Sequence, residues 1–233
     1  MRPKAYEQVA ERLRDLVVAG ELEPGQRLPT ESILAAEHGV SRATVREALR
    51  LLAAQNLIRT AKGATGGSYV TRPSPDHLSE SLRSGLGLLA EAKDVSLEEL
   101  VEARKLLEVP AARLAALRRA DAHVEELHAA VSHHSPRLPA SAQFVHNRDF
   151  HRVILDACGN TLLSIAAQPI FGVLQTGLAR SRLGAQFHRV IHEQHRSISA
   201  AIEAGDADAA AGEMLAHLEY LTPFYEKAWR RQK

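Results

Sequence analysis

The first part of the chain, about 70 residues, alternates between apolar stripes at helical spacing and short breaks that contain glycine or proline. The stripes predict three helices, and two short β-prone runs around a glycine-rich tip predict a hairpin. The expected helices span about 6–19, 31–37 and 42–55, and the expected strands span 57–60 and 68–71. Thr30 and Ser41 are the N-cap candidates of the second and third helices. This order of elements is typical of a winged helix-turn-helix.

The rest of the chain shows only helical patterns. The expected helices lie at about 76–92, 96–119, 121–134, 139–157, 160–183, 186–204 and 206–230. We therefore expect a mainly α protein, with an N-terminal winged helix-turn-helix and a C-terminal all-α bundle of about seven helices. The stretch Arg72-Pro73-Ser74-Pro75 favours a semi-rigid spacer, because two prolines disfavour helix. We place the first domain at 1–72, a linker at 73–77 and the second domain at 78–233.

Charge and histidine divide the chain in the same place. The 233 residues have 29 Lys and Arg against 28 Asp and Glu, so the net charge of +1 does not by itself indicate a nucleic-acid partner. Residues 1–73 contain 11 basic and 8 acidic residues, whereas 11 of the 12 histidines lie beyond them. A mildly basic first domain and a histidine-rich second domain indicate two separate tasks.

Cysteine content and hydropathy indicate the compartment. The single cysteine, Cys158, excludes an intramolecular disulfide and fits a reducing cytosol. No apolar run approaches the ~20 residues that a membrane helix requires, and the charged N-terminus does not resemble a signal peptide. We expect a cytoplasmic protein without a membrane anchor.

The third predicted helix has the features of a DNA-reading element. Arg42, Arg46 and Arg50 are spaced i, i+4, i+8 and therefore share one face. Arginine pairs bidentately with guanine, and Thr44 can contact a base edge or a thymine methyl group. Ser41 and the free amides at the helix start can hold a phosphate. The alternative interpretation, a solvated arginine face, is weakened by the preceding helix, the tight turn and the wing.

The hairpin tip would form the wing of this element. Gly66 and Gly67 would let the backbone approach DNA closely, and Lys62 would add a phosphate contact. With Ser41, Arg42, Thr44, Arg46 and Arg50, these residues complete the expected DNA-binding set.

Two spaced motifs give the first domain a family resemblance. They are Gly25-x-x-Leu28-Pro29-x-Glu31 and Gly39-Val40-Ser41-Arg42-x-Thr44-Val45-Arg46-Glu47-Ala48-Leu49. Residues 6–72 thereby resemble the N-terminal domain of the GntR family of bacterial transcription regulators. The resemblance implies a homodimer on a short palindromic operator, with Arg42, Thr44, Arg46 and a wing glycine reading the DNA. Many members have arginine where this chain has Ser32, which implies a different operator contact there.

Three stretches of the second domain resemble the FadR-type effector domain of the same family, called FCD. They are Glu102-Ala103-Arg104-x-x-Leu107-Glu108, Asn147-x-x-Phe150-His151-x-x-Ile154 and His195-x-x-Ile198-x-x-Ala201-Ile202, the last followed by Met214-x-x-His217-Leu218. The resemblance covers about 76–225. It implies a divalent metal held at Asn147, His151, His195 and His217, and a pocket arginine at Arg104.

The chemistry of these positions suits zinc or nickel. Asn147 and His151 share a helix face, and His195 and His217 come from two further helices, so one ion could gather all four. Related domains have aspartate at the position of Asn147. The neutral amide leaves a charge of +2 instead of +1, which should lower metal affinity and raise attraction for an anionic effector.

The residues of the second domain allow alternative roles. The histidines could line a metal-free polar pocket or serve packing alone. Arg104 could bind an effector carboxylate or form a surface salt bridge with Glu108. His192 could extend the effector pocket or be solvated. We expect a ligand-responsive regulator, by default a repressor, controlled by a small organic acid. The alternative function is a metal-dependent hydrolase that uses the histidine cluster.

Overall fold

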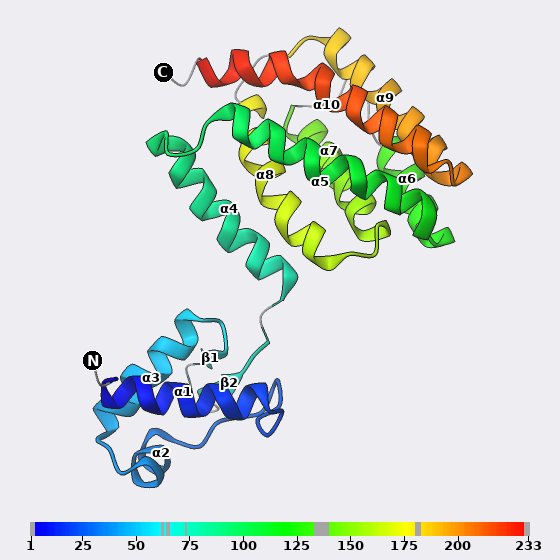
Figure 1. Ribbon diagram of the computed structural model, residues 1–233. Coiled ribbons are helices and arrows are strands. Elements are labelled where there is room, and N and C mark those ends of the chain that lie inside the picture. The colour runs from blue at the N-terminus through cyan, green and yellow to red at the C-terminus, as the bar shows by residue number, and fades with distance from the viewer. Residues whose placement is uncertain are drawn as a thin grey trace. The chain divides into compact units, whose positions relative to one another are not determined.

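The computed structural model describes residues 3–61, 63, 66–72, 74–132, 140–179 and 183–230. The chain forms two compact units, residues 1–74 and 75–233, and each is described by itself (Figure 1). In the described residues, no helix is both long enough and apolar enough to cross a membrane.

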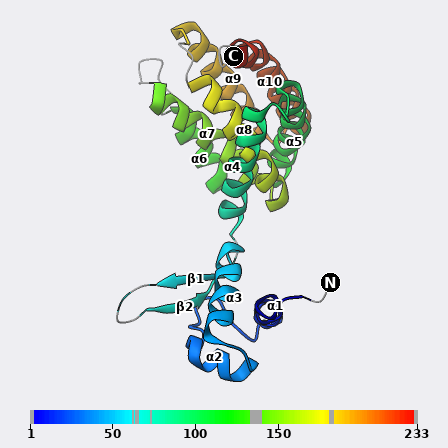
Figure 2. The same ribbon diagram turned by 90° about the vertical axis from the view of Figure 1, so that its left-hand side faces the viewer.

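The first unit is a winged helix-turn-helix. Its elements are α1 (Ala5–Val18), α2 (Glu31–His38), α3 (Arg42–Ala54), β1 (Ile58–Ala61) and β2 (Gly67–Val70). The strands pair antiparallel, with Ile58 opposite Val70, and Figure 2 shows the hairpin projecting from the helices. Leu13, Leu34 and Val45 bring α1, α2 and α3 to one apolar core. The core fixes the exposed face of α3, because the buried stripe of this helix can point only inward.

The second unit is an all-α bundle. Its helices are α4 (Pro75–Ala92), α5 (Leu97–Arg118), α6 (Asp121–Ser132), α7 (Ala140–Ala157), α8 (Thr161–Ala179), α9 (Ala185–Ala204) and α10 (Ala207–Arg230). These seven helices of the described chain confirm the predicted fold class. The ends of two predicted segments, around 133–139, lie outside the described residues.

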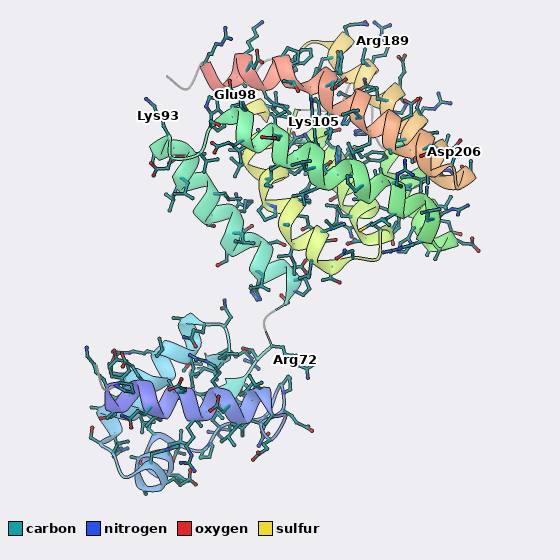
Figure 3. The ribbon with its side chains drawn as sticks, viewed as in Figure 1. Arg72, Lys93, Glu98, Lys105, Arg189 and Asp206 are labelled. Carbon is teal, nitrogen blue, oxygen red and sulfur yellow. The ribbon has the colours of Figure 1, made fainter. Side chains whose placement is uncertain are left out.

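Helix α5 lies at the centre of the bundle, against α7, α8, α9 and α10. A capping box at Ser96 and Glu99 fixes its first turn. Figure 3 shows charged side chains along the outside of α5, where Glu98 and Lys105 are labelled. The opposite face of α5 buries alanines and two charged residues, Arg104 and Glu108. A central helix with a buried ion pair positions the candidate site.

Helix α4 follows the connection between the units and packs along α8. It begins at Pro75, so the last three residues of the predicted linker 73–77 are helical instead. The physical reason is that proline is tolerated at the first helical position, and Asp76 favours the first turn. The α4–α8 contact is close, since a Cβ atom on Gly172 would lie 2.7 Å from Arg83 Cδ.

Candidate functional site

The start of α3 is arranged as the sequence predicts. The Ser41 hydroxyl accepts a hydrogen bond from the Thr44 backbone N–H at 3.1 Å, and the two hydroxyl oxygens lie 2.9 Å apart. Ser41 is therefore the N-cap, and it holds Thr44 at the exposed end of the helix. The first turn of α3 presents a hydroxyl pair and helix-terminal amides to an incoming phosphate or base edge.

The three arginines of α3 lie on its exposed face, but their partners differ. Arg46 makes two hydrogen bonds to Glu31 of α2, from Nε at 3.2 Å and from Nη2 at 2.9 Å. This pair lowers the pKa of Glu31, chiefly through the hydrogen bond from Arg46. Arg50 pairs with Glu47 at 2.6 Å, whereas Arg42 has no ion-pair partner in the described part of the chain. Arg42 is thus the arginine whose guanidinium is available for a new acceptor.

An arginine that the sequence analysis did not select supports the wing. Arg27 Nη2 donates to the Gly66 carbonyl oxygen at 2.5 Å, and a Cβ atom on Gly67 would lie 2.7 Å from Arg27 Nε. A Cβ atom on Gly66 would meet the Gly63 carbonyl oxygen at 2.7 Å, so both glycines allow close packing. No local pattern distinguishes Arg27 in the sequence. Lys62, expected at the wing tip, lies outside the described residues.

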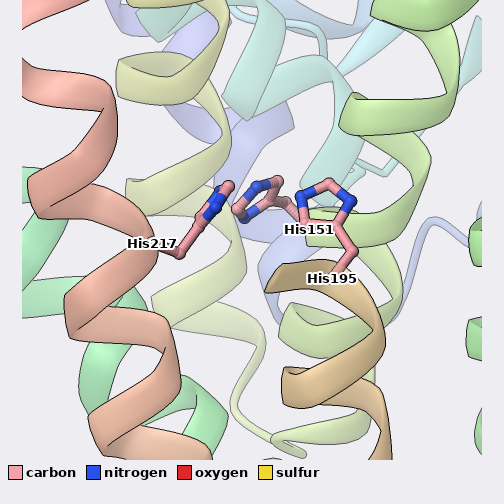
Figure 4. Close-up of side chains that lie close together, drawn as sticks. All are labelled: His151, His195 and His217. Carbon is pink, nitrogen blue, oxygen red and sulfur yellow. The ribbon is translucent and has the colours of Figure 1, made fainter. Parts of the chain in front are cut away.

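Three histidines from three helices meet inside the bundle. His151 of α7, His195 of α9 and His217 of α10 are all buried, and one ligating atom from each lies within 4.8 Å of the others (Figure 4). The rings point toward one another in the close-up. Nitrogen ligands of one zinc ion lie at most about 4.2 Å apart, so small movements of the side chains would bring the three rings onto one cation.

Neighbouring side chains set the orientation of the rings. Gln194 Oε1 lies 2.9 Å from His217 Nδ1 and can only accept, so it places the ring proton there. His217 Nε2 is buried without a hydrogen-bond partner in the described residues. The His195 ring stacks on Phe150, with ring centroids 3.9 Å apart. Outer contacts of this kind are typical of histidines that ligate metals.

Burial favours the neutral form of two of these imidazoles, His151 and His217. It lowers the pKa of His217 well below the ordinary value of 6.5, with further lowering from His151 and Arg104. The pKa of His151 is also lowered by burial, although Glu108 opposes the shift. A neutral imidazole has a free lone pair, which is the form that binds a metal.

Asn147 lies one helical turn before His151 on α7. Its Oδ1 atom is buried and has no hydrogen-bond partner among the residues that the structure describes. A buried oxygen without a partner is costly unless something else satisfies it. The three histidines form a donor set that fits a divalent ion such as zinc or nickel. Asn147 as a fourth ligand stays a prediction, which its orphaned oxygen supports.

Arg104 belongs to a buried network beside the histidines. Its Nε donates to Glu108 Oε1 at 2.6 Å, its Nη1 donates to the Tyr225 hydroxyl, and its Nη2 lies 3.3 Å from His151 Nε2. Arg104 is 2% exposed. The alternative of a surface salt bridge is therefore wrong, because the Arg104–Glu108 pair lies in the core.

Arg104 and Glu108 stay charged although they are buried inside the bundle. Burial opposes the charge on Glu108, but the Arg104 guanidinium and His151 overcome it and lower the pKa of this carboxyl group to about 2. Arg104 also lies over the ring of Phe171, 4.8 Å from its centroid. From the sequence, Glu108 is considered only as a surface partner of Arg104, and Tyr225 and Gln194 are not selected. A helical spacing of eight residues between His217 and Tyr225 was the one available signal.

A cleft of about 530 Å³ reaches this network from outside. Helices α4, α7 and α8 line it, and His151 and Phe171 lie among its walls. Three arginines also line it, Arg83, Arg148 and Arg152. A cleft of this size with a few polar groups is typical of small-molecule sites.

His192 lies elsewhere on α9. It lines a hollow between α6 and α9, together with His128, Ser199 and Glu203. His128 pairs there with Glu203 at 2.9 Å. The expected effector contact of His192 stays a prediction, and the three-histidine cluster does not include this residue.

A winged helix-turn-helix joined to a helical domain with a buried polar site defines a class of ligand-sensing regulators. Residues 5–70 match the family described as bacterial regulatory proteins, gntR family, and residues 99–220 match the FCD domain. The chain belongs to the GntR family of DNA-binding transcription regulators and has an FCD effector domain.

Relatives that match over nearly the whole of both chains support this family assignment. The chain is 31% identical to the HTH-type transcriptional regulator LutR of Bacillus subtilis, over 91% of this chain and 99% of LutR. It is 29% identical to the HTH-type transcriptional repressor NanR of Citrobacter rodentium, over 100% of this chain and 89% of NanR.

A solved structure agrees with these relatives. The structure titled Streptococcus agalactiae GntR matches with a TM-score of 0.68 and 28% identity, over 94% of this chain and 99% of the other. These proteins are transcription regulators. The alternative function predicted from the sequence, a metal-dependent hydrolase, is therefore wrong.

Proposed function

We propose that this regulator is a homodimeric repressor of a palindromic operator, and that a small carboxylate effector releases it from DNA. The effector would bind in the second unit beside a divalent metal, zinc or nickel. One observation supports this proposal most strongly: three buried histidines lie together, and one of them, His151, both contacts the buried Arg104 and lines an open cleft. The relative NanR, which is named as a repressor, supports the direction of control.

The metal would be held by His151, His195, His217 and the amide oxygen of Asn147. A bound divalent ion would supply positive charge and an open coordination position for an anionic ligand. Gln194 fixes the tautomer of His217, so that Nε2 is free to ligate. The set contains no carboxylate ligand, which favours an effector that brings its own negative charge.

Arg104 would orient the effector. A guanidinium fork matches a carboxylate in both charge and shape. Glu108 accepts hydrogen bonds from Nε and Nη2, Tyr225 accepts one from Nη1, and the Nη2 group also lies 3.3 Å from His151 Nε2, on a residue that lines the cleft. His192 is an expected effector contact as well, although it lines the hollow on the far side of α9.

The cleft offers a route from effector to DNA-binding unit. Its lining includes Asp76, Ser79 and Arg83 of α4, the helix that directly follows the connection to the first unit. A ligand that prefers one setting of α4 would shift the population of DNA-binding states by its difference in affinity. A few kcal/mol of such preference suffices to switch operator occupancy.

DNA would be read by α3 and the wing. The N-terminal residues of a recognition helix lie near base edges when the helix enters the major groove. Ser41, Arg42 and Thr44 occupy these positions, with Arg46 and Arg50 further along the same face. Gly66 and Gly67 allow the wing backbone to approach a phosphate, and Lys62 would contribute its charge.

An exposed leucine stripe supports the homodimer. Leu78, Leu82 and Leu89 of α4 are 42%, 47% and 41% exposed. Together with Gly85, they follow one another along the helix at steps of four, three and four residues. This spacing is the seam of a coiled coil. A second copy would cover the stripe with its own α4, and a pair of α4 helices would bring two first units together.

The DNA-binding part of this proposal is tested by measuring the affinity of the protein for DNA by fluorescence anisotropy. The DNA is a fragment from upstream of the protein's own gene. Because Arg42 has no ion-pair partner to lose, Arg42→Ala should weaken specific binding roughly 5- to 150-fold, as expected for one bidentate base contact. The matched control is Arg12→Ala, which removes an exposed arginine from α1. Equal binding by the wild type and Arg42→Ala would contradict the assigned recognition face.

A further inference from the structure

Arg104 is the point at which the buried ion pair meets the histidine cluster. Its Nη2 atom lies 3.3 Å from His151 Nε2, while Nδ1 of the same ring lies 2.6 Å from Glu108 Oε2. Arginine can only donate, so Nε2 accepts and the ring proton lies on Nδ1, toward the carboxylate. Nε2 is therefore the ligating nitrogen of His151, and its single lone pair faces a guanidinium.

We infer that Arg104 and a divalent metal ion compete for His151 Nε2, and that metal binding frees one N–H of the Arg104 Nη2 group for the effector carboxylate. The inference rests on the proposed function and adds a coupling between its two ligands. One lone pair cannot serve both a guanidinium N–H and a metal ion. Metal loading must consequently break the Arg104–His151 contact.

The remaining contacts keep Arg104 in place when this one is lost. Nε donates to Glu108 Oε1 at 2.6 Å, Nη2 donates to Glu108 Oε2 at 3.4 Å, and Nη1 donates to the Tyr225 hydroxyl. The guanidinium also lies over Phe171, which lines the cleft together with His151. The freed N–H would thus stay next to His151 and Phe171, the residues through which a carboxylate in the cleft would approach it.

The charges of the site make the coupling favourable. Glu108 compensates Arg104, whereas the proposed ligands are imidazoles and an amide, without a carboxylate to compensate a divalent ion. A buried excess of positive charge is costly, and a carboxylate ligand relieves it. Metal and carboxylate should therefore tighten each other's binding by the same factor, as linkage requires.

Calorimetric zinc titrations of the full chain test the competition. Arg104→Lys keeps the positive charge and can pair with Glu108, but a single ammonium cannot also hold Tyr225 and His151. We expect Arg104→Lys to bind zinc roughly tenfold more tightly than the wild type, because the competitor is gone. The matched control is Arg113→Lys, an exposed residue of α5 paired with Asp208, which should bind zinc like the wild type.

Acetate, the minimal carboxylate, tests the second half of the inference. Adding it at constant ionic strength should tighten zinc binding several-fold in the wild type and much less in Arg104→Lys. If acetate changes neither protein, or changes both equally, Arg104 does not receive the carboxylate and the inference is overturned.

The outcomes separate this inference from the proposed function. A wild type that binds no zinc overturns the proposed metal centre itself. A wild type that binds zinc as well as or better than Arg104→Lys leaves that centre standing and overturns only the competition. If the variant does not fold, nitrogen-15 NMR of the wild type decides. The Arg104 side-chain resonances must shift on zinc addition, and unchanged resonances would overturn the inference.

Discussion

At the scale of single residues, the second unit buries polar groups in neutral or paired form. His217 is held by Gln194 on one side and leaves its other nitrogen without a partner in the described residues. Arg104 and Glu108 neutralise each other nearby. An arrangement chosen for stability alone would satisfy every buried group. The unsatisfied atoms Asn147 Oδ1 and His217 Nε2 therefore indicate a site built for a ligand.

The metal-free protein should lose stability in mild acid. Burial lowers the pKa of His217 below 6.5 in the folded state, and the groups around it are His151, His195, Arg104 and Glu108. Below pH 6.5 the unfolded chain then binds more protons than the folded chain. The free energy of unfolding should fall as pH falls from about 6.5 toward 5, by up to about 1.4 kcal/mol per pH unit for each such histidine.

Urea unfolding of the chelator-treated protein at several pH values measures this slope. The variant His217→Gln should show a shallower slope, while His38→Gln, a control in the first unit, should keep the wild-type slope. Because the pKa of Glu108 is about 2, that group stays ionised through this window. A stability that rises as pH falls would contradict the buried neutral state of His217.

At the scale of elements, the contact of α4 with α8 connects the cleft to the helix that directly follows the DNA-binding unit along the chain. Gly172 of α8 accommodates the side chain of Arg83, which in turn pairs with Glu80 on α4. The absence of a Cβ atom at this position lets the two helices approach closely. The α4–α8 contact is the element through which a bound effector could change the setting of α4.

Replacing Gly172 by alanine should destabilise the second unit. The added Cβ would lie 2.7 Å from Arg83 Cδ, and overpacking of this kind costs about 1–3 kcal/mol. Gly212→Ala is the matched control, because its Cβ would meet nothing within 4 Å inside α10 and should stabilise the helix by up to about 1 kcal/mol. Urea midpoints that move in the same direction for both variants would refute the assigned packing.

The sequence predicts elements and motif residues well, because these depend on local signals. Apolar spacing locates all seven helices of the bundle, and the resemblance to FCD domains selects His151, His195 and His217. The network around Arg104 was not predictable, since its partner Tyr225 lies 121 residues further along the chain. Spacing alone also could not show whether Arg104 and Glu108 face the core or the solvent.

At the scale of the whole molecule, the chain joins a GntR-type DNA-binding unit to an FCD effector domain. The chain matches LutR and NanR through both units, so this arrangement is shared with relatives of similar length. A palindromic operator would require two first units. The leucine stripe of α4 is the surface that we propose for bringing two copies together.

A charged side chain in the middle of this leucine stripe should make the proposed dimer dissociate into single chains. Leu82→Glu places a carboxylate between Leu78 and Gly85, where a partner helix would have to bury it. We expect the mass from sedimentation velocity to fall to that of one chain, with much weaker operator binding. Leu162→Glu changes another exposed leucine, on α8, and should leave the mass unchanged. A wild type that is already monomeric, or a Leu82→Glu variant of unchanged mass, would exclude this interface.

Measuring bound metal tests the proposed metal-containing effector site most directly. The full-length protein is dialysed against zinc and then against metal-free buffer, and the metal is compared with protein by elemental analysis and native mass spectrometry. We predict one ion per chain in the wild type, and its loss in both His151→Ala and His217→Ala. A folded wild type without metal, or variants that keep a full equivalent, would contradict the metal-containing effector site.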